Sequence, residues 1–156
     1  MMGTHKPYEE RTDPERIQSQ WNKLTGLHNK NESSAAIVRA ATAAELAANF
    51  AIRNEFASKS QFDNMFIDSL LVWANGITGK IDRLLIPITK GEKHHKTITK
   101  LKNISVQINK KRNSVVHQGE FCNPAEAEIV IRQSKEFIET LVGIYEHNYT
   151  FKEKKR

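Results

Sequence analysis

Nine alanines between Ala35 and Ala51 constrain the fold of this chain more than any other stretch of its sequence. Alanine has the highest helix propensity of the amino acids, and its small side chain lets a neighbouring helix approach closely. We therefore predict a long helix over residues 33–58 that packs intimately against other helices. Ser33 or Ser34 can accept the hydrogen bond that starts it.

Apolar residues at helical spacing and start and stop signals predict four further helices. Asp13 followed by Pro14 indicates an N-cap and a first helical residue, and Asn123 followed by Pro124 repeats this signal near the C-terminus. Gly119 is typical of a residue just past a helix end. The expected helices span residues 13–27, 33–58, 62–75 with a bent or short continuation to 86, 94–116, and 124 onward.

The third helix is expected to bury one apolar stripe. Its members share helical spacing and are Phe62, Phe66, Ser69, Leu70 and Trp73.

No segment alternates apolar and polar residues over a useful length, so no strand is predicted. The fold class is all-α: an antiparallel bundle of four long helices plus a shorter N-terminal one. We expect a flexible tail over residues 1–12, one helical domain over residues 13–150, and a basic tail over residues 151–156.

Composition limits the classes of protein that fit. The chain has 156 residues, enough for one domain with a proper core, and a single cysteine, Cys122, which rules out a disulfide framework within it. The N-terminus lacks the apolar segment of a secretory signal, and no apolar run approaches the ~20 residues of a membrane span. A cytoplasmic protein that contacts no membrane is expected.

The net charge of +6 is concentrated in one segment. Residues 80–112 contain ten Lys and Arg but only two acids, which gives +8 and leaves −2 for the rest of the chain. A localised basic field is typical of a protein that binds a polyanion, although a solvated lysine-rich face has the same composition. The expected RNA-binding residues in it are Lys100, Lys102, Lys110 and Lys111.

This basic segment leads into Arg112-Asn113-Ser114-Val115-Val116-His117. Arginine can hold a phosphate through two parallel hydrogen bonds, and histidine moves protons near neutral pH. On an unbroken helix, five residues rotate a side chain by about 140°, so Arg112 and His117 would not meet. They converge only if the helix ends near Val116 or if another surface lies across both.

The sequence also allows purely structural roles for Arg112 and His117. Arg112 lies at the edge of the apolar stripe of its helix, so a salt bridge to Glu45 or to an acid of the last helix would satisfy it. Glu45 would then support Arg112, or it would pair with Arg53. His117 would be favoured near a helix C-terminus by the helix dipole alone.

The motif resembles the Arg-Asn…His motif of HEPN domains, and the resemblance extends over roughly residues 33–148. It implies a small helical bundle and a metal-independent ribonuclease without a cofactor, of the kind found in toxin–antitoxin and phage-defence systems. It implies that Arg112 and His117 are the catalytic pair and that Asn113 assists them. It further implies a homodimer whose two motifs line one cleft, and an antitoxin partner of the nucleotidyltransferase type.

RNA cleavage through the 2′-hydroxyl needs a base, an acid and positive charge at the phosphate. The single histidine of the motif supplies only one proton-transfer group, and a two-fold dimer would supply the second. Two other functions fit the sequence: an inactive HEPN-like module that binds nucleotide, RNA or a protein, and a basic DNA-binding regulator. Metal binding at His94 and His95 and a Cys122 nucleophile are weaker alternatives.

Overall fold

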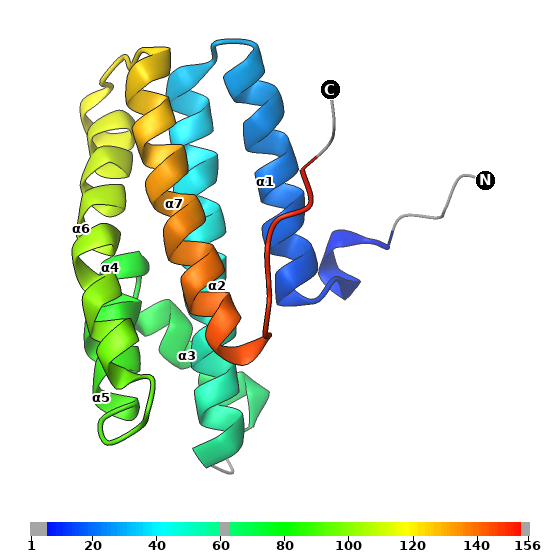
Figure 1. Cartoon of the computed structure of the whole chain (residues 1–156), viewed down its shortest axis with the longest axis vertical. Coiled ribbons are helices and arrows are strands. Elements are labelled where there is room, and N and C mark those ends of the chain that lie inside the picture. Colours follow the sequence, from blue (N-terminus) through cyan, green and yellow to red (C-terminus); the bar gives the residue numbers. More distant parts are fainter. Residues whose placement is uncertain (1–5, 60–62, 154–156) are drawn as a thin grey trace.

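The computed structural model describes residues 6–59 and 63–153, and every regular element among these residues is helical (Figure 1). This confirms the prediction of an all-α fold. The long helices of the bundle are α1 (Asp13–Asn29), α2 (Ser33–Lys59), α6 (His95–Gln118) and α7 (Pro124–Tyr145).

The central helix is α2, which packs against α1, α6 and α7. Eight of its nine alanines between residues 35 and 51 are buried, and only Ala35 is exposed, so the predicted close-packing face exists. By length and composition α2 could also cross a membrane, but 56% of the qualifying stretch is buried inside the bundle. That burial is expected for the core helix of a soluble protein.

The direction of the helices follows from contacts at their ends. Ser34, at the start of α2, accepts a hydrogen bond at Oγ from the backbone N–H of Cys122, just before α7. Glu55 and Tyr145, near the ends of the same two helices, are hydrogen-bonded to each other. Thus α2 and α7 run in the same direction, while α1 and α6 run antiparallel to them (Figure 1).

The helix start signals are confirmed at α7 and shifted by one residue at α1. Asn123 and Glu126 form a reciprocal capping box at the start of α7. At α1 the predicted N-cap, Asp13, is the first helical residue instead. Thr12 is the N-cap, because its hydroxyl and the Glu15 carboxylate satisfy each other's backbone N–H groups.

The third predicted helix is shorter than expected, so the prediction of its length is wrong. α3 (Asn64–Trp73) has ten residues, whereas α1, expected to be the short helix, has 17. Gly76 has a φ of +82°, a conformation that interrupts the helix. The chain continues through α4 (Ile77–Gly79), a π-helical turn η2 (Lys80–Leu85) and α5 (Ile86–Ile88).

The predicted core stripe of the third helix is also wrong. Ile67 and Leu71 are the buried residues of α3, whereas Phe66 and Trp73 are exposed. Phe62, the first member of that stripe, lies outside the described residues.

Both ends of the predicted domain extend further than expected. Residues 8–10 form a 3₁₀ turn, η1 (Tyr8–Glu10), whose carbonyl groups accept hydrogen bonds from Arg16. Phe151, which we assigned to the basic tail, is buried and stacks on Trp21 with the ring centroids 4.1 Å apart. Residues 1–5 and 154–156 of the two predicted tails lie outside the described residues.

Candidate functional site

Arg112 is half-buried on α6 and lacks a carboxylate partner among the described residues. Among the same residues, its guanidinium makes one hydrogen bond, of 3.2 Å, from Nη1 to Oδ1 of the adjacent Asn113. Neither Glu45 nor an acid of α7 forms the salt bridge that the sequence left open. The guanidinium therefore keeps most of its donors free for another group.

Glu45, expected to support Arg112 or to pair with Arg53, pairs instead with Lys80. Lys80 Nζ lies 2.5 Å from Glu45 Oε1, and the lysine side chain is only 5% exposed. A buried ammonium requires a counter-charge, which explains why Glu45 turns toward η2. Arg53 pairs with Asp13 and Asp68.

His117 is exposed and lies within α6, not beyond its end. The helix continues to Gln118, and Gly119 closes it with a φ of +65°. Because no break separates them, Arg112 and His117 point about 140° apart around the helix axis. Within one chain the structure therefore does not bring the two predicted catalytic residues together.

The four predicted RNA-binding lysines fall into two groups. Lys102 lies 2.7 Å from Asp82, and Lys111 lies 2.6 Å from Glu120 and is also bonded to Glu126. Lys100 and Lys110 are exposed, and no carboxylate among the described residues pairs with them.

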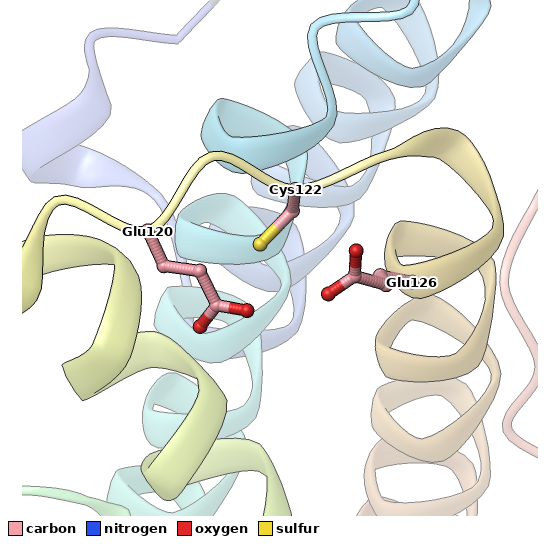
Figure 2. A group of neighbouring side chains, drawn as sticks. All are labelled: Glu120, Cys122 and Glu126. Carbon is pink, nitrogen blue, oxygen red and sulfur yellow. The ribbon is translucent and has the colours of Figure 1, made fainter.

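Lys111 holds together the connection between α6 and α7. Its ammonium bridges the carboxylates of Glu120 and Glu126, and these hydrogen bonds raise the pKa of Lys111 and lower that of Glu126. Figure 2 shows Glu120, Cys122 and Glu126 turned toward one another. Their ligand atoms lie within 4.8 Å, a spacing that a metal ion could use, but the Lys111 ammonium already occupies the position between the two carboxylates and is hydrogen-bonded to both. Burial raises the pKa of the Cys122 thiol, which disfavours the thiolate needed for a ligand or nucleophile.

A groove of about 520 Å³ runs beside the predicted site. Asn113 and Lys110 contribute to its lining, and the other lining residues are Thr78, Val106, Asn109, Ser114 and Gln118. A larger groove of about 1000 Å³ lies between α1 and the C-terminal segment, and no residue of the motif lines it. The smaller groove is therefore the relevant one for the motif, despite its size.

One side of α6, beside this groove, carries a heptad pattern that the sequence did not reveal. Val106, Asn109, Asn113 and Val116 follow one another at spacings of three, four and three, as the a and d positions of a coiled coil do. Val106 and Val116 are 42% and 45% exposed. We call this row the α6 seam; Asn109 and Asn113 in it are half-buried, and Thr78 of α4 lines the groove beside them.

A second charged cluster, at the other end of the bundle, was also missed. The Glu55 side chain is only 3% exposed and contacts Lys59, His94 at 2.7 Å and the hydroxyl of Tyr145 at 2.6 Å. Burial would raise the pKa of Glu55, but the hydrogen bonds from these three groups outweigh it and lower the pKa. His94 therefore has a structural partner, and His95 contacts Thr89.

No protein-family model, curated protein or solved structure matches this chain. The resemblance of residues 112–117 to the HEPN motif therefore stays a prediction from the sequence.

Proposed function

We propose that this protein is a metal-independent endoribonuclease of the HEPN type, whose catalytic cleft is completed by a second copy of the chain. The observation that carries the proposal is the contrast among the charged side chains around α6. Lys80, Lys102 and Lys111 are each neutralised by carboxylates, whereas Arg112 and His117 have no acidic partner among the described residues.

The α6 seam explains how residues that point apart in one chain can meet in two. With Asn113 at an a position and Val116 at the following d position, Arg112 occupies a g position and His117 the next e position. In a parallel pair of helices, a g residue faces the e residue five positions later on the other helix. The five-residue spacing that separates Arg112 from its own His117 thus places it beside His117 of the second copy.

Asparagines at the centre of the seam support pairing with a second α6. Asn113 and Asn109 occupy neighbouring a and d positions, and a buried asparagine in such a seam specifies a parallel dimer at some cost in stability. Val106 and Val116 flank them with exposed apolar surface. Phe121, which is 95% exposed in the connection just beyond His117, would extend the apolar contact at that end.

The chemistry needs no group other than those of the two chains. The 2′-oxygen of a ribose attacks the adjacent phosphorus and loses its proton to one His117. The second His117 donates a proton to the departing 5′-oxygen, so the products are a 2′,3′-cyclic phosphate and a 5′-hydroxyl. The Arg112 guanidinium stabilises the additional negative charge on the non-bridging oxygens.

The remaining basic surface would guide the RNA. Lys100 and Lys110 lie exposed along α6 and provide charge that the Lys102 and Lys111 pairs do not. A cytoplasmic toxin or defence effector with this activity would require restraint, and we propose an antitoxin of the nucleotidyltransferase type as its protein partner.

A direct test uses the purified protein with 5′-labelled RNA in the presence of EDTA. The proposal predicts cleavage that leaves 2′,3′-cyclic phosphate ends, and no cleavage of the same sequence made with 2′-deoxyribose. Intact RNA under these conditions, or equal cleavage of the deoxy substrate, would contradict the ribonuclease assignment.

The second candidate is an RNA-binding module without activity, and the separation of Arg112 from His117 in one chain favours it. Such a module would bind RNA with an affinity that falls steeply as salt rises, but it would leave the RNA intact. Tighter binding to duplex DNA than to RNA would point instead to a DNA-binding regulator.

A further inference from the structure

The exposed face of α3 is the least expected surface of the described chain. Met65 is 82% exposed, Val72 79% and Trp73 63%. With Ser69 they recur at spacings of four, three and one, which places all four on one side of the helix. The opposite side of the same helix buries Ile67 and Leu71.

An α-helix that is apolar on both sides is normally buried on both sides. The bundle covers only one side of α3, so the other remains available for a partner. Large apolar side chains gathered on one face in this way mark an interaction surface, whereas single exposed apolar residues do not.

We propose that the partner is a second copy of α3, packed antiparallel about a two-fold axis at Ser69. The helix rises about 1.5 Å per residue, so Met65 and Trp73 lie about 6 Å on either side of Ser69. In the antiparallel pair, each Met65 therefore meets Trp73 of the second copy. The small Ser69 side chain allows the helices to approach closely where they cross.

Charge complementarity at the rim favours this arrangement over a parallel one. The guanidinium of Arg83 lies over the Trp73 ring, with its carbon 5.7 Å from the ring centroid. Asp63, the N-cap of α3, marks the opposite end of the helix. Antiparallel pairing brings Arg83 of each copy beside Asp63 of the other, whereas parallel pairing places like charges together.

The area of the patch limits the affinity expected for this association. A standard stable interface buries about 800 Å² on each partner, and one ten-residue helix face provides less than this. We therefore expect reversible association in the micromolar range.

This surface is separate from the α6 seam. Figure 1 shows α3 in the lower half of the bundle, whereas the end of α6 that carries Arg112 and His117 lies at the top. Copies that pair through both surfaces form assemblies larger than a dimer. Each two-fold contact joins only two copies, so the second surface of each copy stays free to bind a further one. The association at α3 also does not depend on ribonuclease activity.

Oxidative cross-linking tests the proposed axis directly. Ser69→Cys places a thiol beside its own copy at the two-fold axis, whereas the native Cys122 is buried. Under mild oxidation at micromolar concentration, S69C should form a disulfide-linked dimer on a gel. Thr140→Cys, on the exposed side of α7, is the matched control and should stay largely monomeric.

Sedimentation completes the test. The mass of the wild type should rise with concentration, and Val72→Glu should lower that mass and abolish the S69C cross-link without loss of helix content or RNA cleavage. An S69C variant that cross-links no faster than T140C would overturn the proposal. So would binding of the wild type, but not V72E, to phosphatidylglycerol vesicles without that cross-link, because the face would then belong to a lipid surface.

Discussion

Arg112 and His117 lie on one unbroken helix and point about 140° apart around its axis. A single chain therefore cannot place both on one phosphate, although both are without acidic partners among the described residues. In the dimer that we propose, a parallel second helix at the α6 seam would bring His117 of one copy beside Arg112 of the other.

Loss of either group should abolish RNA cleavage without unfolding the protein. Because general acid–base catalysis contributes roughly 10²–10⁴-fold, His117→Ala should lower the rate by about that factor. Arg112→Lys should also lower the rate of RNA cleavage, because lysine cannot form two parallel hydrogen bonds to a phosphate. Rates on a labelled RNA measure both effects, and the controls are Arg132→Ala and His147→Ala, which change exposed residues outside the motif. Equal losses in the controls would show that the motif is not special.

Disruption of the α6 seam should remove dimers and activity together. Val116→Glu places a charge at an exposed d position, where it costs little in the monomer but opposes pairing. Sedimentation and cleavage assays on the same samples measure the two effects. Ile129→Glu is the control, because Ile129 is 53% exposed on α7 away from the seam. Full activity in a monomeric V116E protein would contradict the two-chain cleft.

Glu55 should make the fold sensitive to acid. Its pKa lies below the ordinary value of 4.5 in the folded protein, so its contribution to stability is present above about pH 4.5 and disappears as the pH falls through the lowered pKa. Glu55→Gln should lower the free energy of unfolding at pH 7 by about 1–3 kcal/mol. Urea titrations between pH 3 and 7 should also show that the free energy of unfolding of this variant falls less steeply toward acid pH than that of the wild type. Glu136→Gln, at an exposed position on α7, should leave the pH profile of the wild type unchanged.

Replacement of Lys111 should expose a latent metal site. Lys111→Met removes the ammonium that bridges Glu120 and Glu126, and three potential ligand atoms within 4.8 Å of one another are left uncompensated. The variant should melt at a lower temperature than the wild type, and Zn²⁺ should restore part of the loss until EDTA is added. An equal effect of Zn²⁺ on the wild type would mean that Lys111 does not block the site.

The alanine face of α2 should not tolerate larger side chains. Ala44 is fully buried, so Ala44→Leu should overpack the contact with the neighbouring helices and cost about 1–3 kcal/mol. Ala35→Leu is the matched control, because Ala35 is the one exposed alanine of the run, and a change within about 0.5 kcal/mol is expected there. Urea denaturation of both variants measures the difference.

The sequence predicted a helix or its ends correctly where these depend on residues close in the chain. Alanine propensity identified α2, and Asn123 and Gly119 fixed the start of α7 and the end of α6 within two residues, because capping depends on near neighbours. The buried face of α3 could not be predicted in this way. Its two faces are both apolar, so periodicity could not tell which one the bundle covers.

The charged contacts were the least predictable part of the candidate site. Glu45 pairs with Lys80 and not with Arg112 because η2 buries that lysine. Lys111 pairs with Glu120 and Glu126 because the turn from α6 into α7 brings these two acids to it. Each pairing depends on the tertiary arrangement of separate elements. Sequence spacing also identified the motif, but not the heptad seam through which its two ends can meet.

Mixing experiments test the central claim most directly. Wild type and His117→Ala chains are combined in equal amounts, allowed to exchange subunits, and assayed for RNA cleavage. If one cleft needs His117 from both copies, only wild-type homodimers are active, and the rate should fall to about a quarter of that of an all-wild-type sample at the same total concentration. A fall to only a half would show that each chain works alone and would contradict the account.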